Sequence, residues 1–331
     1  MGNKILLVEK INQAGIDILE TCGEVILAPD PSEATICSII GDCDAILCRS
    51  TKITAPMFEA GKKLKVLGRH GIGTDNIDIE AATRCGVKVC NTPTANVISV
   101  AEQVIADILY FAKNCHGCDK AMRDGIFAQG GSLPALVNRL GYDNVELYGK
   151  TVGFIGMGKI ARRVAHILVE GFGMRAFGYD PYLPDDAIRA AGCESRHTVE
   201  ELVQNVDYVS IHVPGMPSTM NLVTYDTIKL MKPTAVLINT ARGGIVNEDD
   251  LCRAIDEGLI AGAAVDVFVG ETPAADHPFF SRPKILCTPH VAAMTDGALR
   301  NMAVGAAQAI KDVLEGREPE SCVNKKALEA K

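Results

Sequence analysis

The chain has 331 residues, of which 47% are hydrophobic and 22% are charged, and its formal net charge at pH 7 is −8. This length predicts two domains, and this composition predicts a folded protein rather than a disordered one. The acidic balance argues against nucleic acid or an anionic membrane surface as the main partner. No apolar run reaches membrane-spanning length, and the apolar run near the start is too short for a signal peptide. We therefore expect a cytoplasmic protein.

The 12 cysteines are scattered through predicted strands and helices. Without a signal peptide, they are expected to be reduced thiols that are partly buried. Cys115 and Cys118 have the spacing of redox and zinc motifs, but no second pair stands at the spacing that a zinc site needs. We predict no metal site, and a thiol-based redox role is left as an alternative.

The first hundred residues alternate short apolar runs with helical patterns. Strands are expected over residues 5–8, 24–28, 45–48, 65–68 and 87–90, and helices over residues 14–21, 33–40 and 55–61. This alternation is typical of a parallel sheet with helices on its faces. Ligands in such sheets bind beyond the carboxyl ends of the strands.

Two segments follow strands of this first sheet at that end. Residues 49–52 read Arg-Ser-Thr-Lys, and residues 69–76 read RHGIGTDN. In the second segment, Gly71 and Gly73 leave backbone N–H groups free to turn towards a small anion, and Arg69 adds positive charge. A glycine-rich turn with solvated charges would give the same pattern, so the residues alone leave both interpretations open.

A helix with one apolar side is expected to begin after Ser99. Glu102 stands three residues later, which predicts a capping box with Ser99 as the N-cap. Residues 125–147 are rich in glycine and are predicted to be mostly loops. Their apolar side chains would be costly to leave in water, so this helix and these loops predict a homodimer.

Residues 151–180 read TVGFIGMGKIARRVAHILVEGFGMRAFGYD, which is the most informative stretch of the chain. A predicted strand over residues 152–155 runs into two glycines, a helix over residues 159–169 and a second strand over residues 174–179. This order is typical of a βαβ unit that binds a dinucleotide. Gly156 would allow the tight turn, and Gly158 would let the backbone approach a pyrophosphate. The free N–H groups at the helix start would attract that anion.

Two further residues of this stretch refine the prediction. Ala161 takes the place of the usual third glycine and is small enough for close packing of helix on strand. Asp180 follows Gly158 by 22 residues, where a carboxylate can accept hydrogen bonds from the adenosine ribose. It would also repel a 2′-phosphate, so NAD is predicted rather than NADP. A glycine turn without a ligand is the alternative.

The alternation resumes after Asp180. Strands are expected over residues 208–213, 235–238, 261–267 and 285–287, and a last helix over residues 296–315. Polar and charged residues again follow several of these strands, as the end of a parallel sheet that binds ligands would require.

Six segments, in this order, resemble the D-isomer-specific 2-hydroxyacid dehydrogenase family. They are RHGIGTDNID (69–78), SVAE (99–102), TVGFIGMGKI (151–160), NTARGGIV (239–246), DVFVGE (266–271) and TPHVA (288–292). Residues 49–52 and 68–78 look closest to 3-phosphoglycerate dehydrogenases and their relatives. The resemblance implies an α/β fold of two doubly wound parallel-sheet domains. A Rossmann NAD-binding domain, residues 99–288, would be inserted into a flavodoxin-like substrate-binding domain, residues 1–98 and 289–331.

The resemblance also implies a catalytic trio of Arg242, Glu271 and His290. A histidine suits proton transfer near neutral pH, a glutamate would orient its ring and favour the charged form, and an arginine can bind a carboxylate or polarise a carbonyl. The family usually has Glu-Pro directly, whereas Thr272 stands between Glu271 and Pro273 here. Counting back from Pro273 would select Thr272, but a threonine cannot support the basicity of a histidine as a carboxylate does.

For the cofactor, the resemblance adds six residues around the dinucleotide: Lys159, Ile160, Val213, Thr240, Ala241 and Asp266. Lys159 and Ile160 would lie at the helix start and Asp266 near the carboxamide. For the substrate, it adds the backbone N–H groups of Gly71, Ile72 and Gly73 as a cradle for the carboxylate. Arg49 and Arg69 would meet a distal phosphate or another anionic group.

We therefore expect an NAD-dependent oxidoreductase that transfers a hydride between NAD(H) and a small D-2-hydroxy acid or its 2-oxo acid. A doubly anionic substrate such as 3-phosphoglycerate is favoured. Two alternatives stay open, a glyoxylate or hydroxypyruvate reductase and a non-enzymatic protein that senses NAD. The expected partners are a small-molecule substrate and a second copy of the chain, with no nucleic acid and no membrane.

Overall fold

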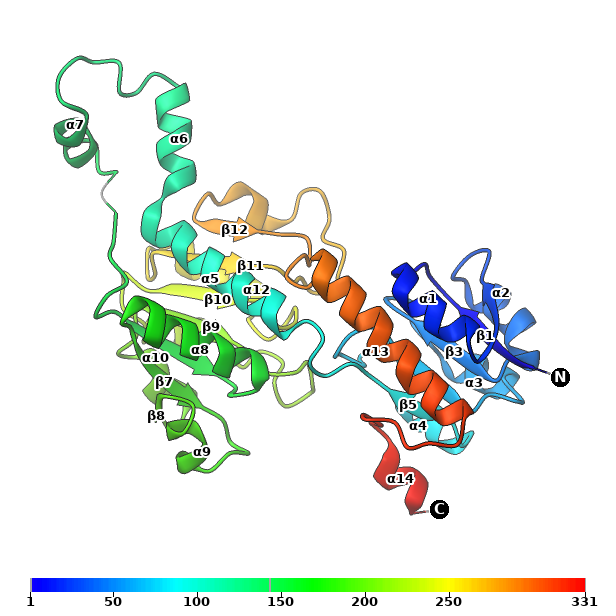
Figure 1. Ribbon diagram of the computed structural model, residues 1–331. Coiled ribbons are helices and arrows are strands. Elements are labelled where there is room, and N and C mark those ends of the chain that lie inside the picture. The colour runs from blue at the N-terminus through cyan, green and yellow to red at the C-terminus, as the bar shows by residue number, and fades with distance from the viewer. Residues whose placement is uncertain (1, 143, 331) are drawn as a thin grey trace. The chain divides into compact units, whose positions relative to one another are not determined.

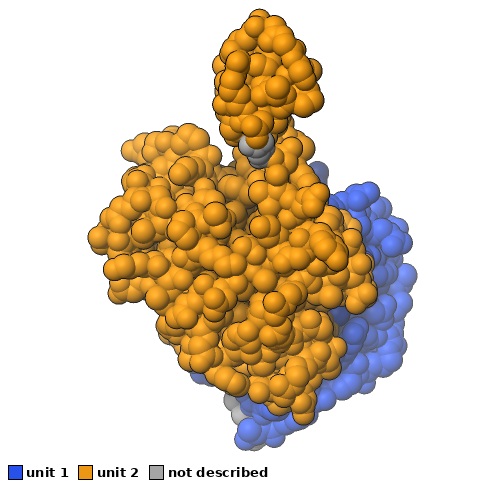
Figure 2. Space-filling model, turned by 90° about the vertical axis from the view of Figure 1, so that its left-hand side faces the viewer, with its two compact units in different colours: residues 1–99, 293–331 blue, residues 100–292 orange. Residues whose placement is uncertain are grey.

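The computed structural model describes residues 2–142 and 144–330, so that residues 1, 143 and 331 of the predicted segments lie outside it. The chain divides into two compact units (Figure 2). Unit 1 runs up to Ser99 and resumes at Ala293, and unit 2 is Val100–Ala292 between these two parts. Each unit is built on one parallel sheet, which confirms the predicted fold class of two parallel-sheet α/β domains.

The sheet of unit 1 has the strand order β2-β1-β3-β4-β5, and all its pairings are parallel. The strands are β1 (Asn3–Leu7), β2 (Gly23–Leu27), β3 (Ala45–Cys48), β4 (Val66–Arg69) and β5 (Lys88–Cys90). This is the flavodoxin-like order, in which the winding direction reverses between β1 and β3. Every residue of β3 is buried, which explains its continuous apolar run.

Helices of unit 1 lie on both faces of this sheet (Figure 1). They are α1 (Gln13–Glu20), α2 (Glu33–Ile39), α3 (Ala55–Ala60), α4 (Ile79–Arg84) and α13 (Asp296–Leu314), with a short 3-10 turn at Ile40–Asp42. The last helix, α14 (Lys325–Glu329), has no buried residue. The late helix α13 returns to pack closely on α1, since a Cβ added at Gly15 would lie 2.8 Å from the carbonyl oxygen of Ala303. The short helix α4 had not been predicted.

The sheet of unit 2 has seven parallel strands in the order β12-β11-β10-β9-β6-β7-β8. They are β6 (Thr151–Ile155), β7 (Arg175–Tyr179), β8 (Cys193–Ser195), β9 (Tyr208–Ile211), β10 (Val236–Asn239), β11 (Gly262–Val265) and β12 (Ile285–Cys287). The winding direction reverses between β6 and β9, where open α/β sheets bind their ligands. All of these strands except the short β8 had been predicted.

Two apolar clusters cover the two faces of this second sheet. The helices are α5 (Val97–Lys113), α8 (Lys159–Phe172), α9 (Asp185–Arg189), α10 (Val199–Val203), α11 (Tyr225–Lys229) and α12 (Glu248–Asp256), with a 3-10 turn at Pro278–Ser281. One cluster joins α5, α8 and α9 to the sheet, and the other joins α10, α11 and α12 to its opposite face. The sheet is therefore covered on both sides, as a parallel sheet requires.

The predicted N-cap and capping box at Ser99 are wrong. Helix α5 begins two residues earlier, at Val97, because turn hydrogen bonds from Ala95 to Thr92 and from Val97 to Thr94 already lead the chain into it. Ser99 therefore lies inside the helix and is buried, and its hydroxyl oxygen is 2.6 Å from that of Thr295.

Residues 114–142 form an arm that stands away from the sheet of unit 2 (Figures 1 and 2). It contains α6 (Cys115–Arg123) and α7 (Leu133–Arg139), so the prediction of mostly loops after residue 125 is wrong over α7. Pro134 stands in the first turn of α7, where its missing N–H costs nothing. The arm has only a small apolar cluster of its own, and Met122 and Leu133 are 55% and 50% exposed.

Three further features of the described chain concern membrane spanning, metal binding and the Cys115–Cys118 pair. No helix in the described chain is long and apolar enough to cross a membrane. Residues 2–142 and 144–330 contain no group of three histidine, cysteine or acidic side chains placed to hold a metal ion. Cys115 and Cys118 lie in α6, and both are free thiols.

The acidic side chain of Asp107 is buried in unit 2 and has a raised pKa. Asp107 of α5 is 3% exposed and accepts a hydrogen bond of 2.8 Å from Gln103 Nε2. Burial raises the pKa of Asp107 to about 7, the bond from Gln103 opposes this, and the negative charge of Asp266 adds to it. Asp107 therefore exchanges its proton in the physiological pH range.

This raised pKa predicts how stability depends on pH. The unfolded chain loses the Asp107 proton near pH 4, well below the folded protein, so the free energy of unfolding should fall as the pH rises from about 4 to about 7. Asp107→Asn removes this loss. We expect its melting temperature to exceed that of the wild type by more at about pH 8 than at about pH 5, measured by thermal denaturation. An equal displacement at both pH values would contradict this.

Candidate active site

The two glycines of the turn between β6 and α8 differ in the space around them, and only Gly158 leaves room for a ligand. Gly156 has φ +91°, and a Cβ there would lie 2.8 Å from the carbonyl oxygen of His212. The protein itself therefore requires this glycine. Around Gly158, by contrast, no described atom other than those of Gly158 and its two chain neighbours lies within 4 Å of the place that a Cβ would take. Packing does not require a glycine at this position, so the open space is available to a ligand.

The start of α8 fits an anion in that space. Gly158 is the N-cap, no side chain in the described structure caps the helix, and its first turn carries no acidic residue. The first turn closes through the N–H of Arg162 and the carbonyl of Gly158, 3.1 Å apart. The earlier N–H groups, at Lys159 and Ile160, are thus left for a ligand such as a pyrophosphate.

Asp180, at the end of β7, is tied to the same turn. Its two carboxylate oxygens accept hydrogen bonds from the N–H groups of Met157, at 2.9 Å, and Tyr182, at 3.0 Å. These contacts hold a negative charge beside the glycine turn. Ala161 is fully buried in the cluster between α8 and the sheet, which fits its predicted role in close packing.

The hydroxyl group of Thr240, which follows β10, is placed to bind a polar atom of a ligand. Thr240 is 8% exposed, and its hydroxyl has no hydrogen-bond partner within the described chain. A buried hydroxyl without a partner is costly, so a ligand atom at this place would stabilise it. The neighbouring N–H of Ala241 is already used, because it donates to Asn239 Oδ1 at 3.1 Å. Val213 lies at the glycine turn, since its Cγ1 would be 2.9 Å from a Cβ at Gly156.

The contacts of Asp266 fix the loop that carries His290. Asp266 is buried, and its carboxylate accepts hydrogen bonds from Thr288 Oγ1 at 2.6 Å and from the N–H groups of Val291 and Ala292 at 2.9 Å each. Its backbone oxygen accepts the N–H of His290 at 2.8 Å. The predicted contact of Asp266 with a nicotinamide carboxamide stays a prediction.

His290 and Glu271 form a hydrogen-bonded pair. Nδ1 of His290 is 2.8 Å from Oε2 of Glu271, and their side chains are 42% and 61% exposed. Because a carboxylate only accepts, Nδ1 carries the hydrogen and Nε2 is left for a substrate. Both residues have left-handed backbone, with φ +67° at Glu271 and +54° at His290. Such conformations are strained for residues with a side chain and cluster at functional sites.

Arg242 lies in a turn that packs on the segment before Glu271. It follows β10, and its Nη1 donates to the carbonyl of Ala241 at 2.7 Å. The next residue, Gly243, packs so closely on the segment after β11 that a Cβ there would overlap the carbonyl of Phe268. The turn that carries Arg242 is thus in direct contact with the segment that carries Glu271.

The predicted carboxylate cradle of unit 1 is built around Gly71. This glycine has φ +133°, and a Cβ there would overlap the guanidinium of Arg69, which also donates to the carbonyl of His70. The N–H of Gly71 is already used, because it donates to Thr92 Oγ1 at 3.0 Å. The N–H groups of the next two residues, Ile72 and Gly73, donate to no other group of residues 2–142 and 144–330.

Three residues that shape this edge had not been predicted. Asn91 Nδ2 donates to the carbonyl of Ile72 at 2.7 Å, and Thr92 binds Gly71 as described. Both follow β5, so their place at the carboxyl end of a strand was the signal that could have found them. Glu9, which follows β1, is the third.

Glu9 holds the segment that carries Arg49. Its carboxylate accepts the N–H groups of Arg49, Ser50 and Thr51 at 2.8 Å each. Burial alone would raise the pKa of Glu9, but these hydrogen bonds together outweigh it and lower the pKa. Arg49 Nη2 lies 3.0 Å from the sulfur of Met294. The ionised carboxylate of Glu9 therefore fixes the backbone of this segment.

Two other histidines near the strand ends are unsuited to give up a proton at neutral pH. Burial lowers the pKa of His70 to about 4, with the charge of Arg49 adding to the effect, and its Nε2 faces the carbonyl of Leu299 at 3.2 Å. Burial lowers the pKa of His212 to about 3, and its Nε2 faces Ser210 Oγ at 2.9 Å. Both stay neutral, which leaves His290 as the better acid–base group.

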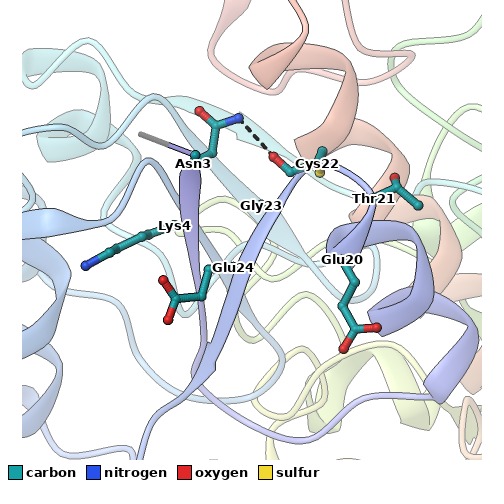
Figure 3. Close-up of a pocket in the computed structure, with 8 residues that line it drawn as sticks. Asn3, Lys4, Glu20, Thr21, Cys22, Gly23 and Glu24 are labelled. Atoms are coloured by element: carbon teal, nitrogen blue, oxygen red, sulfur yellow. Dashed lines mark hydrogen bonds between the residues drawn. The ribbon is translucent and has the colours of Figure 1, made fainter.

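A cavity of about 540 Å³ opens elsewhere, at the amino ends of β1 and β2 (Figure 3). Its lining residues are Gly2, Asn3, Lys4, Glu20, Thr21, Cys22, Gly23 and Glu24. The Asn3 amide is already paired with the carbonyl of Cys22 at 2.9 Å. This end of a parallel sheet is opposite to the end that binds ligands, so we assign the cavity no function.

Comparison with known proteins places the chain in a family. Residues 105–292 match a family model described as D-isomer specific 2-hydroxyacid dehydrogenase, NAD binding domain. A D-3-phosphoglycerate dehydrogenase of Methanocaldococcus jannaschii is 38% identical over 322 residues, which cover 97% of this chain and 59% of the relative. The enzyme of the same name from Synechocystis sp. is 37% identical, over 97% of this chain and 56% of the relative. The chain thus spans a little over half the length of these relatives.

Solved structures agree over nearly the whole chain. A protein from Thermus thermophilus has a TM-score of 0.84 and 28% identity, with 97% of this chain and 99% of that chain covered. An NADPH-dependent glyoxylate/hydroxypyruvate reductase from Sinorhizobium meliloti, solved with NADP and malonate, has a TM-score of 0.85 and 26% identity, with 99% and 98% covered. The chain belongs to the D-isomer specific 2-hydroxyacid dehydrogenase family, with a nicotinamide dinucleotide as cofactor.

Proposed function

We propose that the chain is an NAD-dependent dehydrogenase that interconverts a small D-2-hydroxy acid and its 2-oxo acid. The observation that carries the proposal is the 2.8 Å hydrogen bond between His290 Nδ1 and Glu271. When bound, a dinucleotide would supply or accept the hydride at C2. In the direction of reduction, His290 Nε2 donates a proton to the carbonyl oxygen. In the direction of oxidation, Nε2 takes that proton from the hydroxyl. Glu271 orients the ring through its contact with Nδ1.

The residues around this pair complete the proposed site. Arg242 polarises the carbonyl or binds the carboxylate with its guanidinium. Gly158, with the free N–H groups at the start of α8, would hold the pyrophosphate, and Gly156 shapes the turn that presents them. The other proposed cofactor contacts are Lys159, Ile160, Asp180, Val213, Thr240, Ala241 and Asp266. The charge of Asp180 favours NAD over NADP, because it would repel a 2′-phosphate.

Unit 1 supplies the proposed contacts with the substrate. The N–H groups of Ile72 and Gly73 bind its carboxylate, and Gly71 shapes their turn rather than donating. Arg49 and Arg69 suit a second anionic group, so we propose 3-phosphoglycerate or a similar doubly anionic acid as the substrate. The relatives named D-3-phosphoglycerate dehydrogenase support this choice. Unit 1 would then be the substrate-binding domain and unit 2 the NAD-binding domain. The predicted domain boundaries, after residues 98 and 288, lie one and four residues before the unit boundaries after Ser99 and Ala292.

Reduction of glyoxylate or hydroxypyruvate is the second candidate. It is favoured by the likeness of the whole chain to the solved glyoxylate/hydroxypyruvate reductase. A protein that only senses NAD is the third, and it leaves the strained Glu271–His290 pair without a purpose. We further propose that the protein works in the cytoplasm without nucleic acid or a membrane as partner, which cell fractionation would test.

A panel of acids tests the proposed activity. We expect turnover of phosphohydroxypyruvate with NADH, and of 3-phosphoglycerate with NAD, to exceed that of glyoxylate, hydroxypyruvate and lactate, because only the doubly anionic acids use both Arg49 and Arg69. NADPH should support less turnover than NADH. Absorbance of the reduced dinucleotide measures both preferences. Faster turnover of glyoxylate or hydroxypyruvate would instead support the second candidate.

The variant His290→Ala tests the proposed acid–base role of His290. It should lower kcat by at least about 100-fold, as loss of a general acid–base group does. Its dissociation constant for NADH, measured by fluorescence, should stay close to that of the wild type. Unchanged turnover in His290→Ala would remove His290 from the mechanism, and no turnover of any acid by a wild type that binds NADH would favour the sensing protein.

We also propose that the chain forms a homodimer. The exposed apolar side chains of the arm, among them Met122 and Leu133, are the kind of surface that a second copy would cover. Light scattering at micromolar concentration should give about twice the mass of the chain. Met122→Glu combined with Leu133→Glu should shift the protein towards the monomer, because it would bury two charges. A monomeric wild type would contradict the proposal.

A further inference from the structure

We propose that Glu248 and His277 are positioning residues for the catalytic pair. Together they fix the two ends of the segment 269–277, which carries Glu271. The inference rests on the proposed function for its kinetic consequence but not for its geometry. No part of the proposed reaction uses either residue directly.

One carboxylate holds the first end of this segment. Glu248 is the first residue of α12, and its Oε1 accepts the N–H of Val269 at 2.9 Å. The N–H of Glu271 donates to the carbonyl of Phe268 at 3.1 Å, so the turn that presents Glu271 is closed next to this anchor. Gly270 and Glu271 have consecutive left-handed φ values of +77° and +67°. The anchor thus lies immediately before the strained residues.

The same carboxylate holds the other end. His277 Nε2 is 3.3 Å from the second oxygen of Glu248, and His277 Nδ1 accepts the N–H of Phe279 at 3.3 Å. Nδ1 is therefore the acceptor, and Nε2 carries the hydrogen that is donated to Glu248. The ring packs against Phe268 and Phe279, with centroids 5.4 and 4.8 Å away. Both ends of the segment therefore meet on Glu248.

Apart from the close packing of Gly243 on Phe268 and Val269, little else in the described chain holds the segment in place. Residues 269–272 and 274–276 are exposed, so burial of apolar surface contributes little here. The backbone hydrogen bonds of Thr272 to Gly270 and of His277 to Ala274 are internal to the segment. Of its contacts with the rest of unit 2, those with Glu248 fix its ends, and the bond of Glu271 to His290 fixes its middle. Loss of Glu248 should therefore let Glu271 move away from His290.

The test compares Glu248→Ala with Asp249→Ala. Asp249 is the next acid in the same first turn of α12, so it controls for the effect of charge on the helix. We expect Glu248→Ala to lower kcat by roughly 10- to 100-fold, as a misplaced catalytic group does, with the dissociation constant for NADH unchanged. Glu248→Gln, which keeps an acceptor for Val269, should retain part of the activity. Asp249→Ala should behave as the wild type.

A readout independent of turnover is the ring of His290. Its ¹⁵N shifts at neutral pH, read through the carbon-bound ring protons, report which nitrogen carries the hydrogen. Glu248→Ala should shift the hydrogen from Nδ1 towards Nε2, because Glu271 no longer holds it, and Asp249→Ala should not. If Glu248→Ala does not fold, His277→Ala keeps the bond to Val269 and carries the same comparison against Asp249→Ala.

The outcomes separate this proposal from the proposed function. An unchanged His290 ring in a folded Glu248→Ala would overturn the positioning role, whatever the loss of stability. An equal shift in Asp249→Ala would also overturn it, since the effect would belong to the helix. A shifted ring in a protein that turns over none of the acids would support the positioning role and count against the dehydrogenase.

Discussion

The hydrogen bond between His290 and Glu271 is the interaction on which the rest of the site depends. It fixes the hydrogen on one ring nitrogen and leaves the other for a substrate. It joins two non-glycine residues with left-handed backbone, a conformation that costs about 1–3 kcal/mol for each. Two buried or half-buried carboxylates oppose that cost. Asp266 ties down the loop of His290 with three hydrogen bonds, and Glu248 ties down the segment of Glu271.

The topology of the two sheets explains why chemistry collects where it does. Parallel strands present their carboxyl ends at one edge, and the winding reverses between β6 and β9 in unit 2 and between β1 and β3 in unit 1. The glycine turn follows β6, and Glu9 with the Arg49 segment follow β1 and β3. In both units a carboxylate accepts backbone N–H groups, so that Glu9 in unit 1 and Asp266 in unit 2 fix the loops around them.

Much of this could be predicted from the sequence, and the misses have a common cause. Buried parallel strands are continuous apolar runs, so nearly all of them were found, and the glycine turn with Asp180 identified the cofactor class. The start of α5 was missed because Ser99 resembles an N-cap locally while its hydroxyl pairs with Thr295, far along the chain. Glu248 was missed for the same reason, because its partners are distant in sequence and an isolated acid has no pattern that reveals them. Glu9 and Asn91 also bind distant partners, and only their place after a strand could have pointed to them.

The most direct measurement is the position of the ring hydrogen of His290 in the wild type and in Glu271→Gln. The ¹⁵N shifts at neutral pH should show the hydrogen on Nδ1 in the wild type. In Glu271→Gln, whose amide can donate as well as accept, a substantial share should move to Nε2, and kcat should fall with it. The same distribution in both proteins would contradict the claim that Glu271 sets the state of His290.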